Sequence, residues 1–218
     1  MDPKKIKNII DYLAGVTLSV EEGLTFLNEN SLGKVKFSTS FGFEDQVITR
    51  NIATNNFSNI EIFTLDTGRL FQETYSVWSS TLERYKNLKI QAYYPQSELL
   101  SDFVTNNGVN AFYESIALRK SCCDIRKVEP LKRALEGVAI WITGLRGGVD
   151  NGRSKMPIVT WDESFNLIKY NPLINWSIEE VKDYIKKYNI PYNPLHDKGF
   201  ASIGCAPCTR ALREGESE

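Results

Sequence analysis

The sequence predicts an α/β fold with a mainly parallel β-sheet and helices on both faces. Two observations carry this prediction. Strand-like and helix-like segments alternate through the middle of the chain, which is the pattern of parallel sheets with crossover helices. Three of the strand-like segments run into loops rich in polar and glycine residues, and ligands of such sheets bind beyond the carboxyl ends of the strands.

The first half of the chain begins with two predicted helices. Residues 5–14 place apolar side chains at helical spacing, and Ser19 with Glu22 forms a capping box at the start of a helix over about 20–29. Strands and helices then alternate. We expect strands at 35–40, 60–65 and 88–93, and helices at 46–53 and about 71–85.

The second half begins with helical segments and then returns to the sheet. The adjacent cysteines are expected to open a helix in which Pro130 is a weak point. Ser177 with Glu180 forms another capping box, at the start of a clearly amphipathic helix. We expect helices at 97–104, 111–118, about 123–136 and 177–188, and strands at 138–142 and 165–170.

Length and charge exclude several classes of protein. The 218 residues are enough for one domain with a substantial core, and we expect residues 1–218 to form a single domain. With 26 basic and 27 acidic residues the net charge is -1, so the chain has no bulk attraction to nucleic acid or to an anionic membrane. An anionic ligand therefore needs a local cluster of basic residues. The sequence has no signal-like N-terminus and no apolar run of membrane-spanning length, so we expect a cytoplasmic protein.

All four cysteines fall into two pairs: Cys122 and Cys123 are adjacent, and Cys205 and Cys208 have C-x-x-C spacing. Adjacent cysteines rarely bridge each other, because a disulfide needs a wider Cα separation. Four thiolates suit either Zn²⁺ or an iron–sulfur cluster. Two other interpretations stay open: four buried inert thiols, and a redox dithiol of Cys205 and Cys208 that leaves the adjacent pair unexplained.

Two loops that follow predicted strands offer groups for an anion or a nucleoside. In the loop 38–45, backbone N–H groups, a helix N-terminus and the hydroxyls of Ser38 and Ser40 can surround an anion. Gly42 lets a ligand approach the backbone closely. The loop 65–69 offers backbone amides to a base or ribose. Each loop also has a plain interpretation: the loop 38–45 as an ordinary strand–helix turn, and the loop 65–69 as an Asx turn.

A third loop, 144–155, carries Arg146, Arg153 and Lys155 on a glycine-rich backbone. Arginine can hold phosphate or sulfate with two hydrogen bonds, so the loop suits a polyanionic ligand. A solvated surface loop has the same composition, and this interpretation stays open.

Several other residues attract a functional interpretation. Arg126 and Lys127 adjoin the cysteines, so they either bring the anionic end of a ligand near the metal centre or are exposed helix charges. His196 is the single histidine, and we expect a turn residue bonded to backbone rather than an acid–base catalyst. Trp141 and Trp176 are expected in the core.

Three stretches carry a family resemblance: 120–131 with Ser-Cys-Cys-Asp-Ile-Arg-Lys, 141–146 with Trp-Ile-Thr-Gly-Leu-Arg, and 191–210 with Gly-Cys-Ala-Pro-Cys. Nearly the whole chain resembles assimilatory adenylyl-sulfate (APS) reductases, the iron–sulfur branch of the phosphoadenylyl-sulfate (PAPS) reductase family. The resemblance implies a Rossmann-like α/β fold related to the PP-loop, adenine nucleotide alpha hydrolase-like enzymes. It also implies reduction of APS to sulfite with release of AMP. The implied cofactor is a [4Fe-4S] cluster on Cys122, Cys123, Cys205 and Cys208.

The resemblance also assigns residues to the substrate. Ser40–Asp45 matches a modified PP-loop at the phosphosulfate, and Leu65–Gly68 matches the loop that holds the nucleoside. Lys127 matches a lysine between cluster and substrate that supports catalysis, while Arg146 and Arg153 match an arginine loop. The expected substrate-binding residues are Ser38, Ser40, Gly42, Glu44, Asp45, Leu65, Asp66, Thr67, Gly68, Lys127, Gly144, Arg146 and Arg153.

Two departures from the family pattern affect these expectations. In the arginine loop, Gly147, Val149 and Asp150 replace an Arg, a Gln and a Ser. The family's nucleophilic cysteine lies on a C-terminal tail, and this sequence ends at Glu218, where that tail is expected to begin. In the implied reaction the tail thiolate attacks sulfur to form an S-sulfocysteine, and thioredoxin or a similar thiol releases sulfite. We therefore expect no catalytic cysteine in this chain, which should bind APS without turning it over.

Three alternatives compete with APS reduction. A PP-loop ATP pyrophosphatase or tRNA-thiolating enzyme is the first, but Ser40–Asp45 lacks the Gly-Gly-Lys-Asp-Ser run expected there, and the near-neutral charge attracts tRNA little. Reduction of PAPS is the second, although the sequence shows no residue that is clearly suited to bind the 3′-phosphate of PAPS. A non-catalytic nucleotide- and metal-binding module is the third. The expected partners are APS and a thiol reductant, without nucleic acid or membrane, and a homo-oligomer stays open.

Overall fold

The computed structural model describes residues 3–30, 32–147, 156–213 and 215–216. In this part of the chain a six-stranded sheet has the order β3-β2-β1-β4-β6-β5, and every neighbouring pair is parallel except β5 with β6. The direction of strand order reverses between β1 and β4, which is where ligands bind in such sheets. The strands are β1 (Lys34–Ser38), β2 (Ile60–Leu65), β3 (Ile90–Tyr93), β4 (Val138–Ile142), β5 (Val159–Asp162) and β6 (Leu167–Tyr170).

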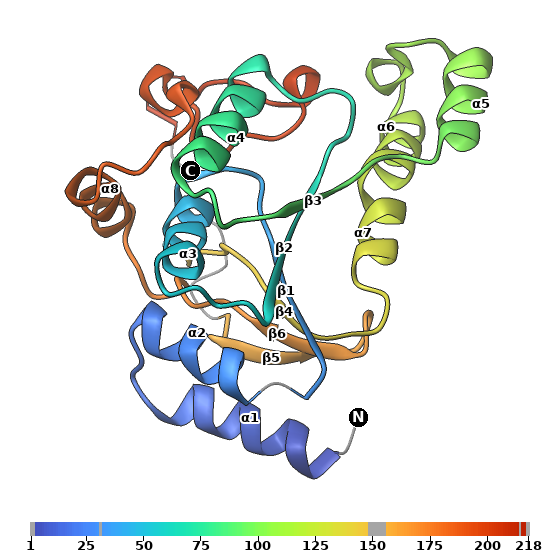
Figure 1. Cartoon of the computed structure of the whole chain (residues 1–218). Coiled ribbons are helices and arrows are strands. Elements are labelled where there is room, and N and C mark those ends of the chain that lie inside the picture. Colours follow the sequence, from blue (N-terminus) through green and yellow to red (C-terminus); the bar gives the residue numbers. More distant parts are fainter. Residues whose placement is uncertain (1–2, 31, 148–155, 214, 217–218) are drawn as a thin grey trace.

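Helices cover both faces of the sheet (Figure 1). On one face α3 contacts α2 and α8, and on the other α7 contacts β2 and β3. The predicted mainly parallel α/β fold is therefore confirmed. The helices are α1 (Pro3–Gly15), α2 (Val20–Glu29), α3 (Phe43–Thr54), α4 (Gln72–Arg84), α5 (Ser97–Asn107), α6 (Ile116–Cys123), α7 (Glu129–Ala134) and α8 (Ile178–Lys187), with a π-helical segment η2 (Asp124–Val128) and the 3-10 turns η1 (Ala111–Tyr113), η3 (Pro194–Lys198) and η4 (Ala206–Cys208).

Both faces of the central strands are largely buried, because helices cover a parallel sheet of this kind on both sides. Phe37 on β1 and Ile142 on β4 are fully buried in a large core that includes the apolar side chains of α3. Phe63 on β2 is fully buried in a smaller cluster with Ala134 of α7. Both predicted capping boxes are present, and they start α2 and α8 where expected.

The region of the adjacent cysteines differs from the prediction. Cys122 and Cys123 end α6 instead of opening a helix, and the π-helical segment η2 joins α6 to α7. Pro130 stands in the first turn of α7, where a missing N–H is tolerated and the wider winding before it makes room for the ring. The predicted helix 111–118 is a 3-10 turn followed by α6, because the side chain of Ser115 caps a new helix.

Two further differences concern the ends and pairing of elements. Helix α3 begins at Phe43 and not at residue 46, so Glu44 and Asp45 lie in its first turn. The short strand β5 is absent from the prediction. It forms because it pairs antiparallel with β6 across a turn in which Asp162 Oδ1 accepts from Ser164 N at 3.0 Å, and strand pairing depends on such tertiary neighbours.

The C-terminal segment runs along the end of the sheet that carries the loops after β1 and β2 (Figure 1). Ala206 N donates a hydrogen bond to Arg69 O at 2.8 Å, and Leu70 forms an isolated antiparallel bridge with Cys205. The C-x-x-C segment is therefore attached to the loop that follows β2.

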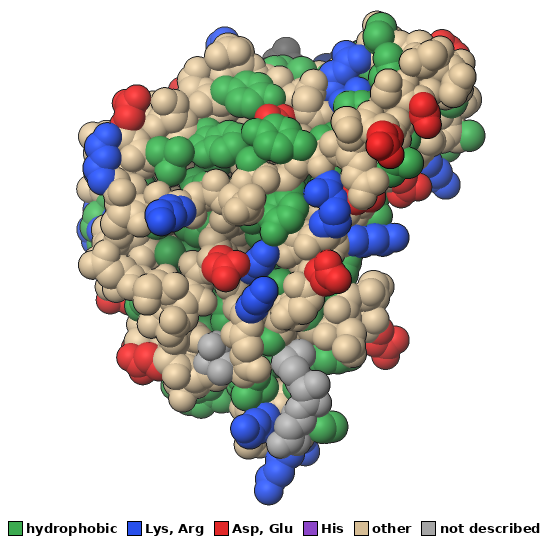
Figure 2. Space-filling model, turned by 45° about the vertical axis from the view of Figure 1, so that its right-hand side comes forward, with side chains coloured by type: hydrophobic (Ala, Val, Ile, Leu, Met, Phe, Trp, Pro, Cys, Tyr) green, Lys and Arg blue, Asp and Glu red, His purple; other side chains and the backbone are tan. Residues whose placement is uncertain are grey.

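The surface charge and the polarity of the helices agree with the amino-acid composition. On the face drawn in Figure 2, Lys and Arg side chains are interspersed with Asp and Glu side chains, as a near-zero net charge requires. Among the described helices, none combines the length and the apolar character that crossing a membrane demands.

Candidate active site

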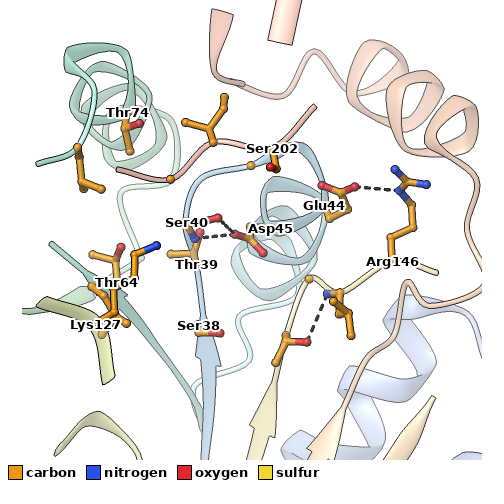
Figure 3. Close-up of a pocket in the computed structure, with 18 of the residues that line it drawn as sticks. Ser38, Thr39, Ser40, Glu44, Asp45, Thr64, Thr74, Lys127, Arg146 and Ser202 are labelled. Atoms are coloured by element: carbon orange, nitrogen blue, oxygen red, sulfur yellow. Dashed lines mark hydrogen bonds and ion pairs between the residues drawn. The ribbon is translucent and has the colours of Figure 1, made fainter. Parts of the chain in front are cut away.

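A cavity of about 680 Å³ opens at the carboxyl ends of β1, β2 and β4. This is the usual ligand position in parallel α/β sheets, and the volume suits a small organic ligand. Residues from all three predicted ligand loops line it (Figure 3). The expected substrate-binding residues that line the cavity are Ser38, Ser40, Gly42, Glu44, Asp45, Leu65, Thr67, Lys127, Gly144 and Arg146.

Asp45 organises the first loop. Its Oδ2 accepts hydrogen bonds from Ser40 N at 2.6 Å and from Ser40 Oγ at 2.8 Å (Figure 3). Burial raises the pKa of Asp45 to about 6 against the opposing effect of the Ser40 hydrogen bonds, and the nearby Glu44 charge raises it as well. The loop therefore contains a buried carboxylate whose charge changes close to neutral pH.

The third loop approaches α3 closely because residue 144 is glycine. A Cβ atom on Gly144 would lie 2.1 Å from Asp45 Oδ1, a separation that two such atoms cannot adopt. Arg146 Nε donates to Glu44 Oε1 at 3.0 Å, on the opposite side of the cavity from Lys127 (Figure 3). The predicted ligand Arg153 lies outside the described residues, as do Val149 and Asp150.

Some residues of the second loop line the cavity, and others stabilise the loop itself. Leu65 and Thr67 line the cavity. Asp66 is buried, and its Oδ1 accepts from Gly68 N at 2.9 Å and from Tyr75 Oη at 2.8 Å. Asp66 and Gly68 therefore lie outside the cavity lining and form the Asx turn that shapes the loop.

All four cysteines line one small hollow beside the cavity, which we call the cysteine hollow. Its other lining residues are Arg69, Phe112, Arg119, Arg126, Lys127 and Pro207. Cys205 Sγ donates to Thr67 Oγ1 at 3.3 Å, and Tyr113 Oη donates to Pro207 O at 3.0 Å. Contacts from the second loop and from η1 thus bring the C-x-x-C segment to the adjacent pair of cysteines.

The cysteine hollow contains four thiols, which is the donor set of both zinc sites and iron–sulfur clusters. The four thiols are free, yet within the described ranges no three or more His, Cys, Asp or Glu side chains are placed to hold one ion. A zinc site needs each sulfur about 2.3 Å from the same ion, whereas each thiolate of a four-iron cluster binds its own iron, so the sulfurs stand further apart. Arg126 supplies positive charge beside Cys122, and its buried Nε has no hydrogen-bond partner among the described atoms.

Lys127 connects the cavity and the cysteine hollow, and no other described residue lines both. It lies close to the C-x-x-C segment, since a Cβ atom on Gly204 would be 3.6 Å from Lys127 Nζ. The neighbouring Arg126 is buried, and its Nη1 donates to Thr67 O at 2.6 Å. Of these two basic residues, Lys127 is the one placed to reach a ligand in the cavity.

Trp141 and Lys169 line the cavity and are missing from the expected site residues. Trp141, expected in the core, is half-buried, and its Nε1 donates to Ser38 Oγ at 2.9 Å. Lys169 lies on β6 with Nζ 4.7 Å from the centroid of the Trp141 ring. The sequence did contain a signal for Lys169, because a lysine inside the apolar run Leu-Ile-Lys-Tyr is unusual unless it has a binding partner.

His196 is a turn residue, as expected. Its Nδ1 lies 2.8 Å from Phe200 O, and its ring stacks on Phe43 with the centroids 4.0 Å apart. The imidazole also lines the cavity, so its position there comes from packing against the first turn of α3.

Known proteins resemble this chain in sequence and in structure. Residues 34–211 match the family described as the phosphoadenosine phosphosulfate reductase domain. An adenosine 5′-phosphosulfate reductase from Agrobacterium fabrum (strain C58) is 46% identical over 85% of this chain and 71% of its own. One from Sinorhizobium fredii (strain NBRC 101917 / NGR234) is 44% identical over 97% of this chain and 82% of its own.

Among solved structures, the phosphoadenylyl-sulfate (PAPS) reductase of Candida auris in a phosphate complex superposes with a TM-score of 0.78 at 28% identity, over 96% of this chain and 98% of the other. An FMN adenylyltransferase of Candida glabrata, with a TM-score of 0.55 at 13% identity over 94% of this chain and 72% of its own, shares the fold alone.

Proposed function

The chain belongs to the phosphoadenosine phosphosulfate reductase domain family, and from this membership we propose that it reduces adenylyl sulfate (APS) to sulfite and AMP in sulfate assimilation. The observation that carries the proposal is the position of Lys127, between a cavity of nucleotide size and a hollow lined by four cysteines. The names of the relatives from Agrobacterium and Sinorhizobium support APS over PAPS as the substrate.

In the proposed complex the phosphosulfate lies at the first loop. The N–H groups at the start of α3 donate to it, since Gly42 gives that helix no side-chain cap. Ser40 Oγ donates to Asp45 in this structure. The negative charge of the bound anion favours protonation of Asp45, and the Ser40 hydroxyl can then donate to the anion. Further proposed contacts come from Ser38, Glu44, Leu65, Thr67, Lys127, Gly144, Arg146 and Arg153.

The proposed reaction has two steps. A cysteine thiolate attacks the sulfur of APS, the bond from sulfur to the phosphate oxygen breaks, and AMP leaves with that electron pair, so that an S-sulfocysteine forms. A second thiolate then attacks the cysteine sulfur of this group, which forms a disulfide and releases sulfite. Two thiols are thus oxidised while the sulfuryl sulfur gains two electrons. Lys127 and Arg146 stabilise the negative charge on the departing AMP.

The attacking thiolate is a cysteine other than Cys122, Cys123, Cys205 and Cys208, because these four are assigned to the metal centre and a thiolate bound to iron is a poor nucleophile. By analogy with the family, this cysteine is proposed to lie on a C-terminal tail. The second thiol comes from thioredoxin or a similar reductant in the cytoplasm.

The four cysteines of the hollow would hold a [4Fe-4S] cluster. When bound, the cluster supplies a fixed centre of charge next to the substrate, while the two thiols provide the electrons. Lys127 holds the sulfuryl end of APS at the border between the cavity and the hollow.

Sulfite release tests the proposed reaction. The 218-residue chain is incubated with APS and reduced thioredoxin, alone and with an appended tail that carries either one cysteine or one serine. We expect sulfite from the cysteine version only. Several turnovers by the 218-residue chain alone would contradict the assignment of the nucleophile, and an absence of sulfite from every version would contradict APS reduction.

The metal content tests the assignment of the cysteines. Anaerobically purified protein should contain about four irons per chain, as the cluster formula requires, and Cys205→Ser should lose them. Stoichiometric zinc without iron would refute the cluster. Titrations with APS, PAPS and ATP on the same sample separate the remaining alternatives, because tighter binding of ATP would favour a PP-loop pyrophosphatase.

A further inference from the structure

Lys169 is a cation inside the cavity that the proposed reaction does not use. It occupies the third position of β6, where it pairs with Trp141 of the neighbouring β4. Its ammonium lies over the indole at 4.7 Å from the ring centroid, and the half-buried side chain lines the cavity. The indole therefore holds the charge in one place by a cation–π contact.

This ammonium has no counter-charge among the residues that the structure describes. In the described parts of the chain, no carboxylate forms an ion pair with Lys169 and no acceptor takes a hydrogen bond from it. Lys36, on the other side of Trp141 in the same row of the sheet, differs: its Nζ donates to Tyr93 Oη at 3.1 Å and lies 3.6 Å from Glu61 Oε2. Partly burying a cation without an acceptor costs free energy, so Lys169 is set to gain from a ligand that offers one.

The sheet register places Lys169 away from the start of α3, where the phosphosulfate is proposed to bind. Lys36, Trp141 and Lys169 are cross-strand neighbours on β1, β4 and β6, and Ser38 is the next residue of β1 on the same face, at the foot of the cavity in Figure 3. Trp141 packs with the cluster beneath α7, whereas the first turn of α3, with Asp45, begins on the opposite face. Lys169 thus lies on the face of the sheet that α7 covers, one cross-strand row further from the carboxyl ends of the strands than the loops.

The surroundings of Lys169 suit a nucleoside better than an anion. Leu65 and Leu131 line the same cavity and belong to the apolar cluster of Trp141. A site of apolar walls with one fixed donor matches a purine–ribose unit, which has flat apolar faces and several oxygen and nitrogen acceptors. For an anion without a nucleoside, Arg146 and the N–H groups at the start of α3 offer several donors at the first loop.

We propose that Lys169 is a substrate-recognising residue whose ammonium donates a hydrogen bond to the nucleoside part of the bound nucleotide. This inference rests on the proposed function, since it takes the ligand of the cavity to be an adenylate. It separates the site into two parts. The first loop with Arg146 and Lys127 holds the charged end, and Lys169 with Trp141, Leu65 and Leu131 holds the nucleoside.

Calorimetric titration of the purified holoprotein tests this division, with AMP and inorganic phosphate as probes. Lys169→Met should weaken AMP binding by roughly 10- to 100-fold, which corresponds to the loss of one hydrogen bond from a charged donor. Binding of inorganic phosphate should stay unchanged. The matched control is Lys187→Met on α8, which removes another lysine held over an aromatic ring, at 5.1 Å from the Tyr188 centroid, but outside the cavity lining.

Three outcomes would overturn the proposal. Unchanged AMP affinity in Lys169→Met would remove Lys169 from recognition. An equal loss for AMP and phosphate would mean that it acts as a general positive charge. A loss confined to adenosine 3′,5′-bisphosphate would reassign it to a 3′-phosphate. Failure of the wild-type protein to bind AMP is a different result, because it would contradict the proposed function itself.

Discussion

The buried charge of Asp45 gives the sharpest prediction about stability. Its carboxylate is buried in the first turn of α3 and accepts hydrogen bonds from Ser40, while Arg146 of the third loop is paired with Glu44. Burial raises the pKa of Asp45 from 3.8 to about 6. Asp45→Asn keeps the shape of the side chain and removes the charge.

The sign of the effect follows from the raised pKa. The folded protein binds the proton of Asp45 more tightly than the unfolded chain, so the contribution to stability is complete below pH 3.8 and is lost as the pH rises through about 6. The full loss is about 3 kcal/mol at 1.36 kcal/mol for each pH unit of difference. About half of it, roughly 1–2 kcal/mol, falls between about pH 5 and pH 7.5.

Melting temperatures across this range provide the assay. For a chain of this length, a free energy of about 1–2 kcal/mol corresponds to a change of about 2–8 °C. The melting temperature of Asp45→Asn relative to wild type should therefore rise by about that amount from pH 5 to pH 7.5. Asp102→Asn on α5 is the matched control, because Asp102 is exposed. If wild type and Asp45→Asn change in parallel with pH, the reasoning about the buried charge is wrong.

Three further predictions follow from single contacts. Gly144→Ala should destabilise the protein by about 1–3 kcal/mol in a denaturation experiment, because the new methyl group must displace Asp45. Gly15→Ala is the control, since nothing lies within 4 Å of its Cβ position. Equal effects of the two substitutions would argue against the clash. Arg146→Ala should weaken APS binding by about 1.5–3 kcal/mol if it forms a charged hydrogen bond to the ligand, and an unchanged dissociation constant would place the anion elsewhere. Ser177→Ala should cost about 1 kcal/mol through loss of the helix cap, which calorimetry detects as a melting temperature lower by about 2–4 °C; an unchanged melting temperature would mean that the cap adds nothing.

Local patterns in the sequence determined the fold class and most of its elements. The run 138–142 is apolar throughout, and the run 60–65 is apolar except for Glu61 and Thr64, which is typical of central strands of a parallel sheet. The capping boxes at Ser19 and Ser177 set the starts of α2 and α8, because the groups that pair are only three residues apart. The positions of the ligand loops followed as well, since parallel strands end at the same edge of the sheet.

Tertiary structure decided what local patterns do not contain. The two cysteine pairs meet only because the C-terminal segment is attached to the loop after β2. Trp141 and Lys169 become neighbours through the register of β4 and β6, and the charge state of Asp45 depends on how deeply the third loop and α3 bury it. Each of these features depends on the packing of segments far apart in the chain, whereas the periodicity and spacing of residues report only on near neighbours.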